Sequence, residues 1–459
     1  MKYKSTRGQT QGVTFKDAVM MGLARDGGLL IPETIPNLSA ARLLEWRGCS
    51  YVDLAFNIIS LFADDLPADD LQKLIARSYQ TFDHELVTPL VKVDEISVLE
   101  LFHGPTLAFK DVALQLLGNL FEYILAERGA TLNILGATSG DTGSAAIAGV
   151  RGRENIDIFV MFPDGKTSPI QERQMTTVLD DNVHNIAVKG SFDDCQHILK
   201  SIFSDLAFKD RYHLGAVNSV NWARVLAQIV YYFSAWFQLG QPDRFDACVP
   251  TGNFGNIFAA YIARHMGLPI DRLILATNEN DILSVFFNTG VYKRGEVRFS
   301  LSPAMNIQVA SNFERYLYYR MGQYADKVNE FMAAFGQHGE ASLHVNTPLV
   351  DELFRAGSTS DEMTLATISR YQQEAAYGVD PHTALGLHIA EQFSRSAIPM
   401  VCMATAHPAK FADIIADILP PESVSHASLD DLKNLPTRKI VLEADVQVVK
   451  DYIADVRTV

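Results

Sequence analysis

The chain has 459 residues, of which 48% are hydrophobic, so it is long enough for roughly two or three domains with apolar cores. Its net charge of -15 provides no basic surface, so we expect no nucleic-acid partner and no membrane partner. The four cysteines lie far apart, with neither metal-ligand spacing nor the density of a disulfide framework. Composition therefore indicates an ordinary globular protein of a reducing cytoplasm, with no metal site.

The N-terminal part differs in pattern from the remainder. Residues 1–12 are polar and lack the apolar core of a secretory signal. Residues 1–94 are predicted to be mainly helical, with glycine and proline breaks at 27–28 and 32–36, which indicates a separate N-terminal domain. The most apolar long stretch, 225–239, is interrupted by polar residues and is too short to span a bilayer, so we predict a buried helix there.

From about residue 97 onward, short β-rich runs alternate with turn clusters and helical patterns. This alternation is typical of βα units on a mostly parallel sheet. Four predicted strands end in polar or glycine-rich loops that lead into helices, at 98–102, 132–135, 247–250 and 400–403. In open α/β sheets, ligands bind beyond the carboxyl ends of the strands. We therefore predict an α/β fold with mostly parallel sheets flanked by helices, and a site at that edge.

The loop 251–256 contains the glycines Gly252 and Gly255 directly after an apolar strand. Such a loop lets backbone N–H groups approach a phosphate, and the following helix adds its positive N-terminal end. A tight turn without a ligand is an equally good interpretation of two glycines. Neither the Walker motif nor the dinucleotide fingerprint is present, so any phosphate belongs to something other than a nucleotide.

Lys110 is predicted to open a helix just after a proline-containing loop, with Phe109 beside it. A desolvated lysine has a lowered pKa, which keeps its amine nucleophilic for imine formation with an aldehyde. The alternative is a solvated surface lysine, whose charge the adjacent Asp111 could neutralise. Together with a phosphate-binding loop, a reactive lysine points to pyridoxal phosphate.

Two further segments offer groups for anions. Residues 139–142 place hydroxyl and N–H groups at a helix N-terminus, where a substrate carboxylate could bind. Residues 218–224 combine amides and a hydroxyl with Arg224, whose guanidinium can fork onto phosphate oxygens. In both segments, ordinary helix capping with a solvated surface explains the same residues.

With these residues in view, the sequence resembles the threonine synthases, pyridoxal-phosphate enzymes of the tryptophan-synthase β-subunit fold, called fold type II. The resemblance covers nearly the whole chain. The motifs that carry it are HGPTLAFKD at 103–111, SGDTG at 139–143, NSVNWAR at 218–224, GNFGN at 252–256, SNFER at 311–315, DPHTA at 380–384 and ATAHPAKF at 404–411, with further matches at 6–8 and 22–29.

The resemblance implies a role for each site residue. It implies that Lys110 is catalytic and holds the cofactor aldehyde, and that Thr405 faces the pyridine nitrogen. The residues it places around the cofactor phosphate are Gly252, Asn253, Phe254, Gly255 and Asn256. The residues it assigns to the substrate O-phospho-L-homoserine are Ser139, Gly140 and Thr142 for the carboxylate, and Asn218, Ser219 and Arg224 for the phosphate.

The resemblance also implies a domain division, with the N-terminal domain at 1–94 and a catalytic domain at 95–459. A smaller mobile subdomain is expected at about 130–212, and the assembly is expected to be a monomer or a homodimer. One departure concerns Asp141, where some members have asparagine beside the cofactor's 3'-oxygen. A carboxylate so near that oxygen would repel it unless another group compensates its charge.

Three functions are compatible with these motifs. The first is conversion of O-phospho-L-homoserine and water to L-threonine and phosphate, the last step of threonine biosynthesis. The second is another lyase of the same fold, such as a threonine or serine dehydratase or a phospho-lyase that releases a 2-oxo acid. The third is a non-catalytic sensor of phosphorylated metabolites.

Overall fold

The larger of the two main sheets is built almost entirely from parallel strands. The structure is a computed structural model, and it describes residues 1–138, 140–344 and 349–457. The larger sheet has the strand order β13-β10-β9-β14-β4-β3, in which only β3 is antiparallel to its neighbour. Its strands are β3 (Leu90–Val93), β4 (Ile96–Glu100), β9 (Phe245–Pro250), β10 (Ile270–Thr277), β13 (Phe354–Ser358) and β14 (Met400–Ala404).

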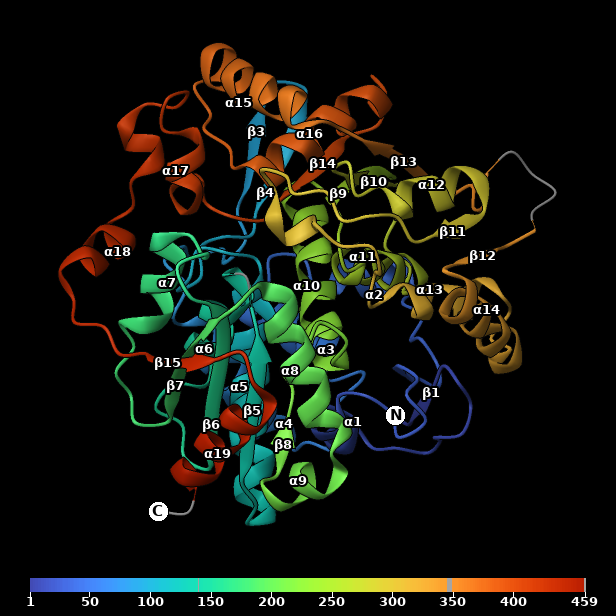
Figure 1. Cartoon of the computed structure of the whole chain (residues 1–459). Helices are drawn as coiled ribbons and strands as arrows, with labels where there is room; N and C mark the ends of the chain where they lie inside the picture. The colour runs from blue at the N-terminus through green and yellow to red at the C-terminus, as the bar shows by residue number, and fades with distance from the viewer. Residues whose placement is uncertain (139, 345–348, 458–459) are drawn as a thin grey trace.

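The smaller sheet lies beside the larger one and is parallel throughout (Figure 1). Its strand order is β15-β7-β6-β5-β8. Its strands are β5 (Leu132–Ala137), β6 (Ile156–Pro163), β7 (Val183–Lys189), β8 (Leu214–Gly215) and β15 (Ile440–Glu443). The last strand comes from the C-terminal end of the chain, which crosses from one sheet to the other through α17 (Ala412–Ile415) and α18 (Ala427–Asp430).

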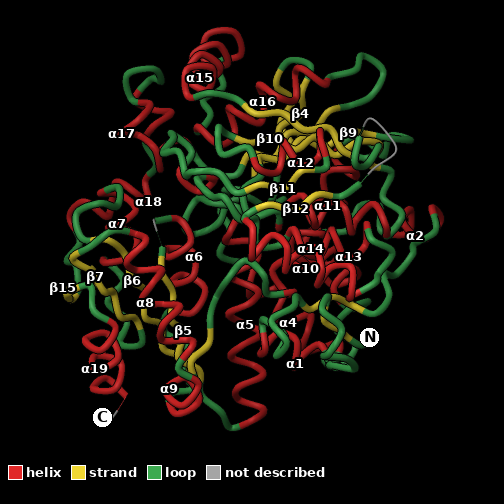
Figure 2. The backbone as a smooth tube through the Cα atoms, turned by 45° about the vertical axis from the view of Figure 1, so that its right-hand side comes forward, coloured by secondary structure: helices red, strands yellow, loops and turns green. Residues whose placement is uncertain are grey.

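Long helices cover the sheets and bury apolar surface on several sides, as Figure 2 shows for the red helices around the yellow strands. Helix α10 is apolar around almost its whole circumference, which is the pattern of a helix enclosed by other elements. It confirms the buried helix predicted at 225–239. The helices that frame the site are α5 (Lys110–Arg128), α6 (Asp141–Val150), α7 (Pro169–Thr176), α10 (Trp222–Gln238), α11 (Gly255–His265) and α16 (Pro381–Phe393).

The N-terminal residues are mainly helical, as predicted, and also contain a small antiparallel pair of strands. The N-terminal helices pack against helices of the catalytic part: α4 packs on α5, and α3 packs on α10. Strand β3 lies within the range 1–94 but pairs with β4, so the last residues of that range belong to the larger sheet. The elements are β1 (Tyr3–Ser5), α1 (Phe15–Met21), β2 (Leu30–Pro32), α2 (Ala40–Glu45), α3 (Tyr51–Ile59) and α4 (Ala68–Tyr79).

The remaining elements lie around this frame. They are α8 (Phe192–Ser204), α9 (Leu206–Arg211), α12 (Ile282–Thr289), β11 (Val291–Lys293), α13 (Phe313–Arg320), α14 (Ala325–His338), β12 (Glu340–Ser342), α15 (Asp361–Ala375) and α19 (Val446–Arg457), with short 3-10 helices η1 (Pro303–Met305), η2 (Pro408–Phe411), η3 (Pro421–Val424) and η4 (Asp431–Asn434). In the described part of the chain, no helix is both long enough and apolar enough to cross a bilayer.

The four predicted strand–loop–helix junctions are present. Strands β5, β9 and β14 contain the predicted segments, each with one or two extra residues. The strand predicted at 98–102 is found at Ile96–Glu100, because its register partner β14 ends at Ala404, opposite Glu100. The backbone beyond that point turns away toward the loop that carries Lys110.

Candidate active site

Two loops at the carboxyl ends of β4 and β14 meet through their backbones. The N–H of Phe109 donates a hydrogen bond of 2.9 Å to the carbonyl oxygen of Thr405, and Ala108 pairs with Ala406 as an isolated bridge. Lys110 is the first residue of α5, as predicted, and is only 9% exposed. The fold therefore brings Lys110 and Thr405 into one site.

Asp111 does not pair with Lys110. Its carboxylate accepts hydrogen bonds from the N–H of Thr106 at 2.8 Å and from the Thr106 hydroxyl at 2.7 Å, so it braces the loop that precedes the helix. Burial raises the pKa of Asp111 to about 6. The alternative in which Asp111 neutralises its neighbour is not supported by these contacts.

Lys110 faces Asp141, the first residue of α6. The Lys110 Nζ lies 3.5 Å from Asp141 Oδ2. Burial lowers the pKa of Lys110, and the positive charges of Lys410 and Arg224 add to that effect. Burial alone would raise the pKa of Asp141, but Coulombic attraction to Lys110 and Lys410 outweighs it, so this pKa is lowered. The site thus holds an amine with reactive character beside a carboxylate.

The predicted phosphate-binding loop connects β9 to α11. Phe254 has a left-handed backbone conformation with φ of 64°, and its ring is buried against Phe287 and Phe313, so only its backbone can face a ligand. Gly255 begins α11, which directs the first N–H groups of the helix toward the loop. This arrangement can receive an anion.

Asn256 is held by two buried tyrosines of α10. Its Oδ1 accepts hydrogen bonds from Tyr231 and, at 2.6 Å, from Tyr232. Its Nδ2 is buried and has no hydrogen-bond partner within the described residues. A buried donor without a partner is costly, so the free amide hydrogen fits a site that is completed by a ligand oxygen.

The segment that follows residue 217 ends in a buried arginine. The Arg224 atoms Nε and Nη1 and the Asn218 atom Oδ1 are buried without partners among residues 1–138, 140–344 and 349–457. Burial lowers the pKa of Arg224 to about 10. A buried guanidinium with free N–H groups is a strong indication of an anionic ligand, because its desolvation is otherwise uncompensated.

Side chains of the loop before α13 join this segment to the phosphate-binding loop. The Ser219 hydroxyl lies 2.6 Å from the Ser311 hydroxyl, which donates at 3.0 Å to Asn253 Oδ1. Asn312 Nδ2 donates to the carbonyl oxygens of Ser219 and Asn253 at 3.2 and 3.1 Å. No individual role for Ser311 or Asn312 follows from the sequence, because nothing local shows that residues 219 and 253 meet.

The loop before α6 is placed beside Lys110 through Asp141. The N–H groups of Gly140 and Gly143 both donate to the Thr138 hydroxyl, which shapes the turn. Thr142 is half-buried in the first turn of α6. Ser139, which was predicted to bind the substrate carboxylate, lies outside the described residues.

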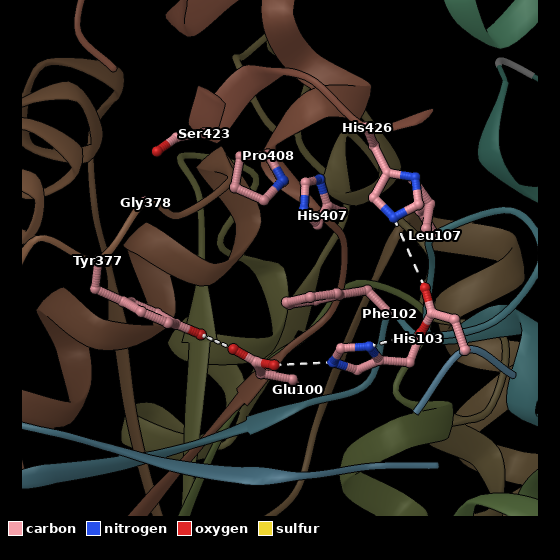
Figure 3. Close-up of a pocket in the computed structure, with 11 residues that line it drawn as sticks. Glu100, Phe102, His103, Leu107, Tyr377, Gly378, His407, Pro408, Ser423 and His426 are labelled. Carbon is pink, nitrogen blue, oxygen red and sulfur yellow. Dashed lines mark hydrogen bonds and ion pairs between the residues drawn. The ribbon is translucent and has the colours of Figure 1, made fainter. Parts of the chain in front are cut away.

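A cavity of about 290 Å³ is lined by Leu107 of the loop before Lys110 and by residues of other segments, but by none of the predicted site residues (Figure 3). A chain of contacts lines it: the Tyr377 hydroxyl donates to Glu100, and His103 bonds Glu100 and Asp83 at 2.8 Å each. His426 Nε2 lies 3.7 Å from Asp83. These polar groups are paired with one another, and none of them is among the site residues that the sequence predicts.

The residues present fit pyridoxal phosphate. A buried amine with a lowered pKa suits an aldehyde, and the start of α11 with the unpaired Asn256 Nδ2 suits a phosphate. The second set of unpaired donors, on Arg224, suits a further anion such as a phosphorylated substrate.

Comparison with known proteins gives the same result over nearly the whole chain. The family models "Threonine synthase N terminus", "Pyridoxal-phosphate dependent enzyme" and "Threonine synthase, C-terminal" match residues 2–79, 81–338 and 383–453. The threonine synthase of Methylobacillus glycogenes is 46% identical, over 99% of this chain and 100% of its own length.

Solved structures agree with the fold. The crystal structure of PLP-bound threonine synthase from Brucella melitensis has a TM-score of 0.97 and 45% identity, with both chains fully covered. The yeast threonine synthase structure has a TM-score of 0.94 and 42% identity, covering 100% of this chain and 99% of its own. The predicted fold type II architecture is confirmed, and the chain belongs to the threonine synthase family of pyridoxal-phosphate-dependent enzymes.

Proposed function

We propose that the chain converts O-phospho-L-homoserine and water into L-threonine and phosphate, with Lys110 as its catalytic residue. The observation that supports this most strongly is the buried Arg224 guanidinium, which has unpaired N–H groups and lies within Coulombic range of Lys110. A dehydratase for an uncharged hydroxy amino acid has no use for a second buried cation that can hold phosphate.

The cofactor roles follow the resemblance residue by residue. Lys110 would hold the aldehyde, Thr405 would face the pyridine nitrogen, and Gly252, Asn253, Phe254, Gly255 and Asn256 would surround the phosphate. Asp141 would lie beside the ring. When bound, pyridoxal phosphate withdraws electrons from the substrate and makes the Cα proton acidic. The Thr405 hydroxyl cannot keep the pyridine nitrogen firmly protonated, which suits elimination and replacement better than transamination.

Lys110 then acts as the proton carrier. When its Nζ is not bonded to the cofactor, Lys110 would remove the proton from Cα and carry protons at Cβ and Cγ. A lowered pKa keeps a useful fraction of this amine unprotonated near neutral pH. Its burial excludes bulk water from the proton transfers until water is needed at Cβ.

The anion-binding residues position the substrate at both ends. Gly140, Thr142 and Ser139 hold the carboxylate, while Asn218, Ser219 and Arg224 hold the phosphate that leaves from Cγ. After bond cleavage the retained phosphate can assist the attack of water at Cβ. The Lys110 amine would be the group that holds the cofactor aldehyde when no substrate is bound.

The domain division stays a proposal, with boundaries at 1–94 and 95–459 and a smaller subdomain at about 130–212. We propose that this subdomain closes over the substrate and so excludes water, as lids do in many enzymes. The predictions of a monomer or homodimer and of a reducing cytoplasm also stay predictions. All four cysteines lie within the described residues and are free thiols, which fits such a compartment.

Product analysis separates the three functions. Purified protein incubated with O-phosphohomoserine should release phosphate and threonine in equal amounts. Equal amounts of phosphate and 2-oxobutanoate would establish the rival lyase instead. A colourless protein that binds O-phosphohomoserine without turnover would establish the sensor.

A further inference from the structure

Asp141 lies between two buried lysines. Its Oδ2 is 3.5 Å from Lys110 Nζ, and its Oδ1 is 3.3 Å from Lys410 Nζ. The Lys410 side chain has no exposed surface, and the Asp141 side chain is 8% exposed. Charges that are removed from water in this way interact far more strongly than surface charges do. The protonation of Lys110 and of Asp141 therefore depends on the other of the two and on the positive charge of Lys410.

The two lysines differ in their hydrogen bonds. Lys410 Nζ donates to the carbonyl oxygen of Thr106 at 2.7 Å and to Gln174 Oε1 at 2.6 Å, and it contacts Asp141 as a third acceptor. An ammonium group has three N–H donors, so Lys410 is fully bonded as a cation. Lys110 contacts Asp141 only at the outer limit of a hydrogen bond. One lysine is fixed, and the other is free to react.

Lys410 also connects the two sheets at the site. It belongs to η2, just after β14 of the larger sheet, whereas Gln174 and Asp141 belong to α7 and α6 beside the smaller sheet. Gln171, on the same helix as Gln174, donates to Asp141 Oδ1 at 3.0 Å. The carboxylate is thus held on one oxygen by Lys410 and Gln171, while its other oxygen faces Lys110.

Resting on the proposed function, we infer that Lys410 is a positioning residue that keeps Asp141 ionised and charge-compensated whatever the state of Lys110. Lys110 changes its charge during turnover because its nitrogen is bonded to the cofactor at one stage and carries protons at another. Without Lys410, Asp141 would draw a proton or bind the Lys110 ammonium tightly. With Lys410 in place, Asp141 orients the Lys110 nitrogen without trapping it.

The electrostatic directions agree with this role. The Asp141 charge raises the pKa of Lys110, and the Lys410 charge lowers it, although burial makes the largest contribution. Lys410 also supplies the compensation that a carboxylate at position 141 requires. An uncharged asparagine at position 141 would need no second lysine to compensate its charge. The function of Lys410 therefore depends on the carboxylate at position 141.

The test is a pH titration of the visible absorption band of the cofactor-loaded enzyme, which reports protonation of the Lys110 nitrogen. Lys410→Met should raise the midpoint by about one pH unit, since removing a nearby cation favours the protonated form. Asp141→Asn should lower it by a similar amount, for the opposite reason. The double variant should return toward the wild-type midpoint. Lys433→Met removes an exposed lysine whose only ion-pair partner among the described residues is Asp430; it is the matched control and should change nothing.

Identical titration curves for wild type and Lys410→Met would overturn the inference. If Lys410→Met does not fold, the comparison is made between Asp141→Asn and the double variant, which differ only in the charge of Lys410. The titration midpoint of Asp141→Asn must then be lower than that of the double variant. Equal midpoints would overturn the inference. A Gln174→Leu variant keeps the charge of Lys410 and removes one of its bonds, so its midpoint should stay near wild type. A wild-type protein with no absorption band would instead refute the proposed function.

Discussion

The backbone N–H of Phe109 donates a 2.9 Å hydrogen bond to the carbonyl oxygen of Thr405, which joins the loop after β4 to the loop after β14. The neighbouring bridge between Ala108 and Ala406 adds a second connection. The position of Lys110 relative to Thr405 is therefore set by main-chain bonds and does not depend on the lysine side chain.

Because main-chain bonds hold this loop in place, Lys110→Ala should abolish cofactor attachment and catalysis without unfolding the protein. We expect loss of the visible absorption band and of threonine formation, with an unfolding transition close to that of wild type. Absorption spectra, a threonine assay and thermal unfolding measure the three quantities. A variant that kept both colour and turnover would end the proposal for Lys110.

Arg224→Met should weaken substrate binding and leave stability unchanged or higher. Loss of hydrogen bonds to a charged phosphate costs about 2–3 kcal/mol, or roughly 30- to 150-fold in KM. Removal of an unpaired buried charge costs the folded state nothing. Steady-state kinetics measures the change in KM, and denaturant unfolding measures the change in stability.

Arg315→Met is the matched control for this prediction. Arg315 is also buried, but its guanidinium donates to the carbonyl oxygens of Leu30 and Val220 and to Asn312 Oδ1. Its loss leaves buried acceptors unpaired, so we expect marked destabilisation. If both variants destabilise equally, Arg224 is a structural residue and the proposed phosphate site is wrong.

The paired substitution Tyr231→Phe and Tyr232→Phe should weaken cofactor binding. Both hydroxyls donate to Asn256 Oδ1 and so direct its Nδ2 into the phosphate-binding loop. Without them the amide can rotate, and we expect roughly ten-fold weaker binding for one lost oriented hydrogen bond. Equilibrium dialysis of pyridoxal phosphate provides the measurement, and unchanged affinity would contradict the role given to Asn256.

His103 should make stability fall as pH rises above 6.5. Burial lowers its pKa, but hydrogen bonds to Glu100 and Asp83 outweigh burial, so the net pKa is raised from 6.5. A raised pKa means that the stabilisation is complete below pH 6.5 and is lost as pH rises through the folded-state value. Denaturant unfolding across this window should show the decline, and His103→Gln should abolish it. A decline of equal size in His103→Gln would assign it to another group.

The parts of the site that sequence predicted are those encoded by local patterns. The strand ends, predicted at 250 and 403 and found at 250 and 404, the helix start at Lys110 and the loop 252–256 each follow from a short apolar run and its adjacent glycine or polar residues. The sequence also singled out Arg224, because Asn218, Ser219 and Asn221 precede it within two helical turns. These features need no knowledge of distant contacts.

The parts that sequence missed depend on contacts between distant segments. Lys410 was noted only within its motif, because its partners Asp141, Gln174 and Thr106 lie far away along the chain. The membership of β15 in the smaller sheet was equally invisible, since a short strand at 440–443 gives no hint of its partner. These contacts form only between segments that are distant in sequence, and the periodicity of one segment contains no information about its partner.

The most direct test of the central claim is to find which lysine holds the cofactor. Borohydride reduction of the cofactor-loaded enzyme fixes the pyridoxyl group on its lysine, and peptide mass spectrometry then locates it. We predict that the group is found on Lys110, in the peptide that contains residues 103–111. Labelling of Lys410, the other buried lysine beside Asp141, or no labelling at all, would contradict the account.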